Sequence, residues 1–216
     1  MEIISHQSRE YFNIKPNGAL IYSRLICKYL IPKIKTDRNW VTINTGNCFD
    51  HSIVFIHSNI NTYKYEYLKK YKDLILVCSQ KSTMNKVRKY GRTIYLPLSI
   101  DIDYVRGYRE PKTKEICYAG RANKIHKDKV PQGVEFLQNR THPDMLRELS
   151  RYKKVYAVGL AALEAKALDC KILPYDPRFP DPDVWVLRDI KDMVPELQKK
   201  LDLAEKRIKN DAKRND

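Results

Sequence analysis

Short apolar runs rich in β-branched residues alternate along this chain with segments of helical spacing, and this alternation restricts the fold more than any other feature. A strand that is followed by a helix and another strand forms a βαβ unit, in which the two strands are parallel. The sequence therefore predicts an α/β protein. The expected strands are residues 2–5, 40–44, 52–57, 74–79, 93–97, 115–120, 133–138, 154–159 and 171–175, and the expected helices are 18–31, 61–72, 80–91, 141–152, 160–168 and one that starts near Pro195.

A polar stretch with a glycine and a proline, residues 99–114, interrupts the alternation. We interpret it as a linker between two small Rossmann-like α/β domains, residues 1–104 and 109–188, followed by a C-terminal helix and tail, 189–216. Ligands of parallel sheets bind beyond the carboxyl ends of the strands, close to helix N-termini. A cleft that the two domains face is the expected site.

Composition excludes several classes of protein. Hydrophobic residues make up 43% of the chain, yet no apolar run approaches the roughly 18 residues of a membrane helix. The first residues, MEIISHQSRE, lack the basic flank and apolar block of a signal peptide. The cysteines are odd in number and form no CxxC pair, which favours a reducing cytoplasm over a disulfide framework or a zinc ribbon. No spacing typical of a metal site is present, so no metal is expected.

The net charge of the chain is +15, and most of the excess lies in its first half. Residues 1–108 contain 17 Lys and Arg against 8 Asp and Glu, a net charge of +9. A basic surface favours polyanionic partners such as nucleic acid, anionic lipid or phosphorylated small molecules. The alternative is a compositional bias that raises the lysine content without any functional meaning.

The stretch YAVGLAALEAKALDCKIL, residues 156–173, predicts a strand, a glycine, a helix and a second strand, and one carboxylate, Glu164, lies in the apolar part of that helix. The N-terminus of the helix 160–168 follows Gly159 and offers free N–H groups and a partial positive charge to a phosphate. Glu164 lies about one turn further on. It is either an acceptor for the hydroxyl groups of a ribose or a solvated residue that the helix dipole favours.

A second glycine, Gly120, ends the expected strand 115–120. Glycine lets a backbone approach a ligand closely, and the following Arg121 has the fork geometry that binds a diphosphate bidentately. Lys124 and Lys127 are close by in the sequence. This segment is a second candidate for phosphate binding.

The order and spacing of these segments resemble those of compact GT-B glycosyltransferases. The segments that carry the resemblance are VCSQKSTMNKVRKYGRTIYLPLSIDIDYV (77–105), CYAGR, GVEFLQNRTHPDMLRELSRYKKV and YAVGLAALEAKALDCKIL, within residues 50–175. The resemblance implies a sugar transfer from a nucleotide-sugar donor, with a UDP-sugar favoured, and no cofactor or metal. One version of the acceptor is a modified base in DNA, as for small phage-encoded glucosyltransferases, and the others are a lipid-linked or teichoic-type polymer at a membrane face and a protein.

The resemblance also assigns roles to residues. Glu164 would bind the ribose of the donor, and the remaining donor-binding residues would surround the diphosphate. The implied donor-binding set is Gly120, Arg121, Lys124, Lys127, Gly159, Leu160 and Glu164. Lys15 and Gly18, in KPNGA, would belong to a loop on the acceptor side, where an anionic acceptor such as DNA fits the basic first half of the chain.

An inverting transfer also requires a base that takes the proton of the acceptor hydroxyl. His57 and His6 each follow an expected strand of the first domain, and they are the candidates. The alternative for His57 is a loop histidine that is hydrogen-bonded locally. We expect His142 to lie at a helix start without a chemical role.

Two departures from the family favour a competing prediction. Retaining members have a second glutamate eight positions before the ribose glutamate, and that position is Tyr156 here. The segment between Arg121 and GVEFLQ is also shorter than the helix that the family has there. The alternative is a non-catalytic GT-B-like protein that binds a nucleotide or a nucleic acid.

Tyrosines and lysines interleave in NTYKYEYLKKYK, residues 61–72. Aromatic rings that stack on bases and lysines that contact phosphates would form a nucleic-acid surface. The favoured alternative is an amphipathic helix whose tyrosines, among them Tyr63, Tyr67 and Tyr71, pack inward while its lysines face water.

Overall fold

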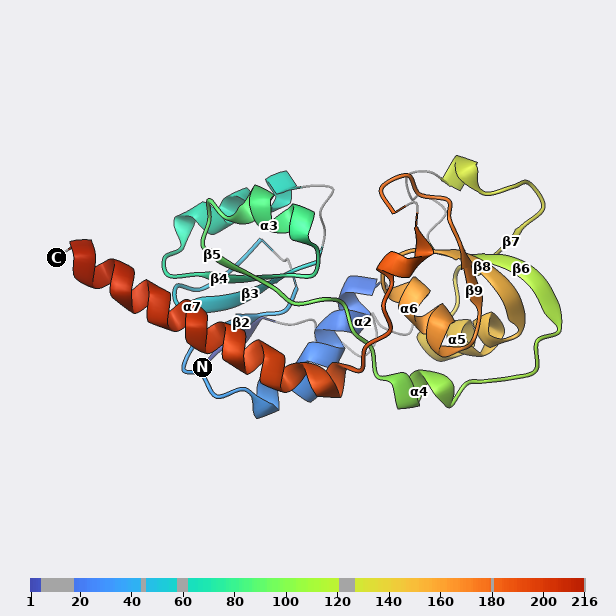
Figure 1. Cartoon of the computed structure of the whole chain (residues 1–216), viewed down its shortest axis with the longest axis horizontal. Coiled ribbons are helices and arrows are strands. Elements are labelled where there is room, and N and C mark those ends of the chain that lie inside the picture. Colours follow the sequence, from blue (N-terminus) through green and yellow to red (C-terminus); the bar gives the residue numbers. More distant parts are fainter. Residues whose placement is uncertain (5–17, 44–45, 58–61, 121–126, 180, 216) are drawn as a thin grey trace. The chain divides into compact units, whose positions relative to one another are not determined.

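The computed structural model of the protein describes the chain except residues 5–17, 44–45, 58–61, 121–126, 180 and 216, and it contains two compact units (Figure 1). Unit 1 consists of residues 1–7, 23–97 and 191–216, and unit 2 of residues 8–22 and 98–190. Both units are α/β with parallel sheets, as expected of Rossmann-like domains. The boundaries differ from the expected ones, because the C-terminal segment belongs to unit 1 and the chain changes unit after Pro97.

The sheet of unit 1 has five parallel strands in sequential order. Every residue of β3 and β4 is buried, which explains their uninterrupted apolar sequences, since a strand covered on both faces has no polar side. The strand order does not reverse among the described residues of this sheet. The strands are β1 (Ile3–Ile4), β2 (Asn39–Val41), β3 (Ser52–Ile56), β4 (Ile75–Cys78) and β5 (Arg92–Tyr95).

The helices of unit 1 are shorter and less regular than the sequence suggests. The expected helix 18–31 is divided into α2 (Gly18–Leu25), a π-helical turn η1 (Ile26–Leu30) and a 3₁₀ turn η2 (Ile31–Lys33). The first residues of α2, 18–22, belong to unit 2. The expected helix 61–72 is the 3₁₀ helix η3 (Thr62–Lys70), and 80–91 contains α3 (Lys81–Val87). η3 and α3 cover one face of the sheet, where Tyr65, Leu68 and Val87 pack on β3 and β4.

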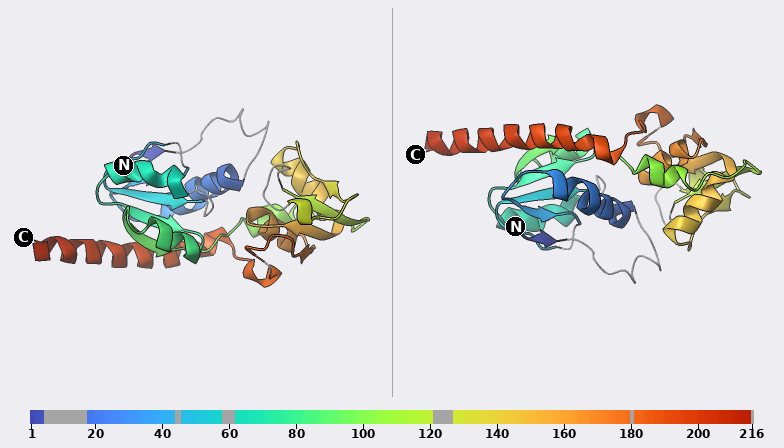
Figure 2. Two further views of the ribbon diagram at one scale, coloured as in Figure 1. Left: turned by 90° about the horizontal axis from the view of Figure 1, so that it is seen from above. Right: turned by 90° about the horizontal axis from the view of Figure 1, so that it is seen from below.

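The last helix, α7 (Met193–Asn215), packs along unit 1, and its C-terminal end extends past the edge of the sheet (Figure 2). Pro195 stands in its first turn, as predicted, where a missing N–H costs nothing. Arg38 attaches this helix to the sheet. Its guanidinium is fully buried, and it binds the carboxylates of Asp73 and Glu205. The buried apolar residues of α7 are Met193, Leu197, Leu201 and Ala204.

His51 gives unit 1 a dependence on pH. Partial burial lowers the pKa of His51, but hydrogen bonds to Asp73 and Asp37 outweigh it and raise the pKa above its ordinary value of 6.5. Protonated His51 therefore stabilises unit 1 below pH 6.5, and this contribution is lost as the pH rises through the higher pKa of the folded state. We expect His51→Asn, which tolerates the φ of +54° at this position, to remove it.

The expected difference is small, because the imidazole is 42% exposed and exposed ion pairs contribute about 0.2–1 kcal/mol. Urea unfolding at pH 5.5 and at pH 8.5, about one unit below and two above an ordinary histidine pKa, measures it. Wild type should lose more stability than His51→Asn between the two conditions. An equal loss in both proteins would contradict the role of His51.

The sheet of unit 2 has four parallel strands in the order β7-β6-β8-β9. The strands are β6 (Lys114–Ala119), β7 (Glu135–Phe136), β8 (Tyr152–Ala157) and β9 (Lys171–Leu173). The longer helices are α5 (His142–Ser150) and α6 (Leu160–Ala167), and α6 contacts α5, β8 and β9. Short turns are η4 (Lys127–Lys129), η5 (Pro182–Val184) and η6 (Ile190–Asp192), the last at the junction with unit 1.

A helix that the sequence analysis missed, α4 (Ile102–Arg106), lies within the expected linker. The carboxylate of Asp101 caps it by accepting a hydrogen bond from the backbone N–H of Tyr104. The helix has only five residues, so their periodicity did not reveal it. Among the described helices of both units, none has the length and apolar character needed to span a membrane.

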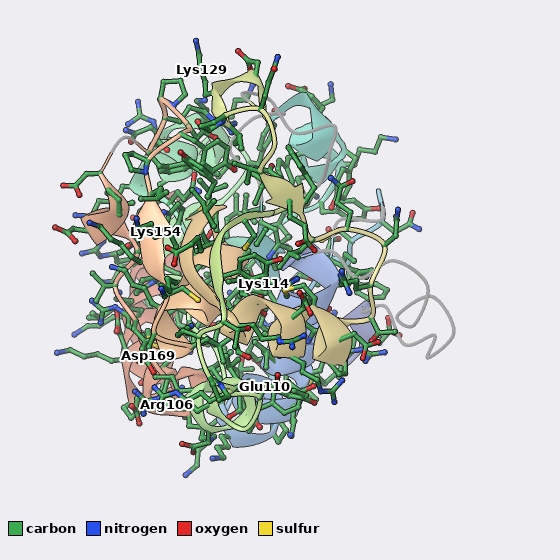
Figure 3. All side chains as sticks on the ribbon, turned by 90° about the vertical axis from the view of Figure 1, so that its right-hand side faces the viewer. Arg106, Glu110, Lys114, Lys129, Lys154 and Asp169 are labelled. Atoms are coloured by element: carbon green, nitrogen blue, oxygen red, sulfur yellow. The ribbon has the colours of Figure 1, made fainter. Side chains whose placement is uncertain are left out.

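Polar contacts hold the amino ends of the strands in unit 2. Lys114, at the start of β6, donates hydrogen bonds to Glu148 and Glu135 and to the hydroxyl of Tyr152. Figure 3 labels Lys114 over the ribbon, together with Glu110 on the segment that leads to it. These contacts occupy the edge of the sheet opposite to the carboxyl ends of its strands.

Candidate functional site

The strand order of unit 2 reverses between β6 and β8. The chain passes from β6 to β7 on one side and then crosses to β8 on the other side, so the connections leave these two central strands in opposite directions. Such a switch point opens a crevice at the carboxyl ends of the strands, where ligands of parallel sheets bind. Ala119 and Ala157 are paired at the ends of β6 and β8. Gly120 and Val158, the residues after them, therefore lie at the switch point.

Both glycines that the sequence analysis selected follow these two strands. A Cβ atom at Gly120 would lie 2.8 Å from the hydroxyl oxygen of Tyr118, a fully buried residue, so even alanine would require that ring to move. Gly159 has φ +66° and ψ −134°, a conformation that essentially only glycine adopts. No described atom lies within 4 Å of the position of its absent Cβ. Gly159 thus leaves open space at the start of α6.

The N-terminus of α6 lies at this switch point. Gly159 is the N-cap of this eight-residue helix, and its side-chain-free position leaves the first N–H groups without a side-chain cap. Leu160, the first helical residue, is buried. A Cβ at Gly18 would be 3.7 Å from the Cβ of Leu160, so the start of α2 lies beside the start of α6 within unit 2. The expected acceptor-side glycine is therefore the first residue of a helix.

Glu164 and His142 form a buried polar pair. Glu164 is 2% exposed, and its Oε1 is 2.7 Å from Nε2 of His142, which is 5% exposed. His142 is the first residue of α5, so each partner belongs to a helix that starts at the carboxyl edge of the sheet. The second carboxylate oxygen of Glu164 has no hydrogen-bond partner among the described residues. One oxygen is positioned by the protein, and the other remains available as an acceptor.

Tyr104 borders this pair from α4. Its ring centroid is 6.1 Å from that of His142, and its hydroxyl is 3.2 Å from the hydroxyl of Tyr108. Partial burial raises the pKa of Tyr104, and the hydrogen bond from Tyr108 and the negative charge of Glu164 raise it further. Tyr104 therefore stays a neutral hydroxyl at physiological pH, and it is one of the exposed large aromatic residues.

His57, the expected base in unit 1, follows the last residue of β3. Its Nε2–H donates a hydrogen bond to the backbone carbonyl of Thr42. Burial lowers the pKa of His57 below 6.5, so the ring is neutral at pH 7. Since Nε2 donates, proton transfer to this ring requires Nδ1. This hydrogen bond agrees with the alternative interpretation of His57, a loop histidine that is hydrogen-bonded locally.

The structure thus brings four predicted residues together at the carboxyl edge of the sheet in unit 2, with Gly18 beside them. They are Gly120, Gly159, Leu160 and Glu164. His57 belongs to unit 1. Four predicted residues, His6, Lys15, Arg121 and Lys124, lie outside the described residues, as does the side chain of Lys127.

The sequence analysis missed the role of His142. The available signal was its place directly after Thr141, whose hydroxyl accepts the N–H of Asp144 as an N-cap. Helix starts that follow parallel strands share one edge of the sheet. That rule brings His142 into the neighbourhood of Glu164 but does not reveal their hydrogen bond.

Two other polar groupings in unit 2 contain none of the predicted residues. Carboxylate oxygens of Asp101, Asp103 and Asp189 lie within 4.8 Å of one another, the one grouping with cation-binding potential found in the described part of the chain. Asp101 and Asp189 each accept a backbone N–H at the start of α4. These carboxylates therefore have a structural use as helix caps.

An open pocket of about 460 Å³ lies along α5. Its three arginines are balanced by three carboxylates, and ion pairs link Arg147 to Asp144 and Arg151 to Glu148. The pocket has no excess charge that would select an ionic ligand. Its lining residues are Glu110, Asn139, Arg140, Thr141, Asp144, Arg147, Glu148 and Arg151.

Comparison of the chain with protein-family models, with curated proteins and with solved structures finds no significant match in any of the three.

Proposed function

We propose that the protein is a nucleotide-sugar-dependent glycosyltransferase of GT-B type, which binds its donor at the carboxyl edge of the sheet in unit 2. The observation that carries this proposal is the junction of β6 and β8. There, Gly159 leaves open space at a switch point, the N-terminus of α6 begins, and Glu164 keeps one carboxylate oxygen unpaired. Phosphates and a ribose are the ligand groups that these features suit.

In this proposal the backbone binds the diphosphate. The first N–H groups of α6 and the positive end of its dipole face the phosphate oxygens, and Arg121 adds a bidentate contact. Negative charge develops on the diphosphate as the bond to the sugar breaks, and preorganised N–H groups and cations stabilise that charge without a metal ion. A UDP-sugar is the favoured donor.

Glu164 supplies the contact to the ribose. His142 holds one carboxylate oxygen at 2.7 Å, and the other accepts a hydrogen bond from a ribose hydroxyl. A buried carboxylate that forms charge-assisted hydrogen bonds on both sides orients the sugar-nucleotide more firmly than a solvated one, because no water competes.

Transfer also requires that the acceptor hydroxyl lose a proton. His57 and His6 are the candidate bases that the sequence indicates, and both belong to the basic first half of the chain. An anionic acceptor, with DNA as one version, suits the basic first half of the chain.

A non-catalytic nucleotide-binding protein is the second candidate, and Tyr156 favours it. This residue stands where retaining members of the family have a glutamate. Its ring packs edge-on against Tyr175, with the centroids 6.1 Å apart, in an aromatic cluster that includes Tyr118. A tyrosine in such a cluster supplies neither a nucleophile nor a general acid.

A thermal-shift screen against UDP, GDP, ADP, CMP and their common sugars tests donor binding. A ligand at about 100 times its dissociation constant stabilises the folded state by roughly 2.7 kcal/mol. A selective shift with one nucleotide is the expected result. If no nucleotide shifts the transition, the donor site is contradicted; if nucleotides bind and no sugar is transferred, the second candidate replaces the first.

Glu164→Gln tests the ribose contact. This change keeps the shape of the side chain and removes its charge, so we expect the dissociation constant of the donor nucleotide to rise about tenfold or more, as for the loss of a hydrogen bond to a charged group. Isothermal titration calorimetry measures it. Glu110→Gln is the matched control on the surface of unit 2, where the carboxylate is 37% exposed. Unchanged affinity in Glu164→Gln would remove Glu164 from the site.

A further inference from the structure

The outer surface of η3 and α3 in unit 1 is strongly basic. Exposed lysine and arginine side chains follow one another along these two helices and the residues next to them, and Glu66 is the one carboxylate within the helices themselves. We call this group the η3–α3 surface. Its exposed members are Lys69, Lys70, Lys72, Lys81, Lys86, Arg88 and Lys89.

Glu66 neutralises little of this surface. Its carboxylate is 3.7 Å from Nζ of Lys69 and 3.4 Å from Nζ of Lys89, and it also accepts a hydrogen bond from the hydroxyl of Tyr90. Lys70 and Arg88 form no ion pair with any residue that the structure describes, and neither does Lys81, whose ammonium lies over the ring of Tyr95. These three cations are available to an external anion.

The tyrosines of this segment face the interior. Tyr65 is 2% exposed, and Tyr67 and Tyr71 pack against the core between the helices and the sheet, with their rings edge to face. This outcome confirms inward packing for these three residues; Tyr63 has no described side chain. The described tyrosines of this segment therefore offer no aromatic platform for stacked bases.

The same surface has no large apolar side chain exposed among its described residues. Peripheral helices that bind membranes combine basic residues with exposed apolar ones that enter the bilayer. A surface with charge alone fits a regular array of phosphates better. Unit 1 as a whole contains 22 Lys and Arg against 11 Asp and Glu, a net charge of +11, whereas unit 2 has 19 against 15.

We infer that the η3–α3 surface binds the phosphodiester backbone of nucleic acid, through charge and without base stacking. Binding of this kind releases counterions from the nucleic acid, does not depend on its sequence, and weakens steeply with salt. The inference does not require glycosyltransferase activity, and nucleotide binding in unit 2 is measured separately.

The test is fluorescence anisotropy of the full chain with a labelled DNA duplex of random sequence, at several salt concentrations. The test variant carries Lys70→Glu, Lys81→Glu and Arg88→Glu. The control variant carries Arg106→Glu, Lys154→Glu and Lys171→Glu, three exposed residues of unit 2 that form no ion pair with described residues. Both variants change the net charge equally, and Lys→Gln and Arg→Gln versions of the test positions serve if the reversals impair folding.

We expect wild type and control to bind DNA with a steep salt dependence. Each lost phosphate contact lowers the log–log slope by about 0.9, so the test variant should lose about 2.7 of it and bind at least tenfold more weakly near 100 mM salt. An equal loss in both variants would overturn the inference, because overall charge would then explain binding. So would absence of DNA binding by the wild type, or binding of phosphatidylserine vesicles that the test variant abolishes while DNA binding persists.

Discussion

Arg38→Ala is expected to destabilise unit 1 by about 2–5 kcal/mol, the cost of truncating a large, fully buried side chain. Arg38 is among the largest fully buried side chains. Its guanidinium donates hydrogen bonds to Asp73, which stands just before β4, and to Glu205 of α7. The change opens a cavity, removes charge-assisted hydrogen bonds and leaves two carboxylates facing one another. Hydrogen exchange of the β3 and β4 amides in urea measures the loss in unit 1 alone.

Arg92→Ala is the matched control, because Arg92 also pairs with an aspartate of α7. That pair is exposed, with 35% of the arginine and 56% of the Asp211 side chain accessible. Exposed pairs contribute about 0.2–1 kcal/mol, so a small effect is expected. If the two variants lose similar stability, burial of Arg38 is not what anchors α7.

Gly159→Val is expected to abolish nucleotide binding. Valine is strained at φ +66°, at about 1–3 kcal/mol for such backbone conformations, and its side chain would occupy the open space at the start of α6. Loss of two hydrogen bonds to a charged phosphate, at about 1.5 kcal/mol or more each, corresponds to an affinity lower by roughly 100-fold. Calorimetric titration with the nucleotide that gives the thermal shift measures it.

Gly133→Val separates strain from ligand contact. Gly133 also lies in unit 2, has φ +80° and has no described atom near the position of its absent Cβ. Both variants should therefore show a similar loss of thermal stability, whereas only Gly159→Val should lose the nucleotide. Equal binding by the two variants would place the nucleotide elsewhere.

The strands were the most predictable part of the fold. LILVC and SIVFI are short, apolar and β-branched, and they form β4 and β3 in the positions that the sequence indicates. The expected strand 133–138 is present as β7 but is only two residues long. The sequence did not reveal α4, because five helical residues show no clear period. It also placed the last helix outside both domains, whereas α7 completes unit 1.

The residues of the candidate site also fall into those that the sequence predicted and those that it did not. Gly120, Gly159 and Glu164 were selected from local patterns, since a glycine after a strand and a carboxylate within an apolar helix are visible in one short stretch. His142 was not, because it precedes Glu164 by 22 residues and meets it only through the packing of α5 against α6.

The sequence by itself determined the α/β class, the places of the glycines and the start of the last helix near Pro195, because each of these depends on neighbouring residues. The tertiary structure alone decided the strand order β7-β6-β8-β9, which places Gly120 and Gly159 at the ends of neighbouring strands. It also decided the hydrogen bond between His142 and Glu164. An apolar pattern states which face of an element must be covered but not by what. The choice of partner depends on contacts between residues far apart in the chain, and these form only when the whole unit packs.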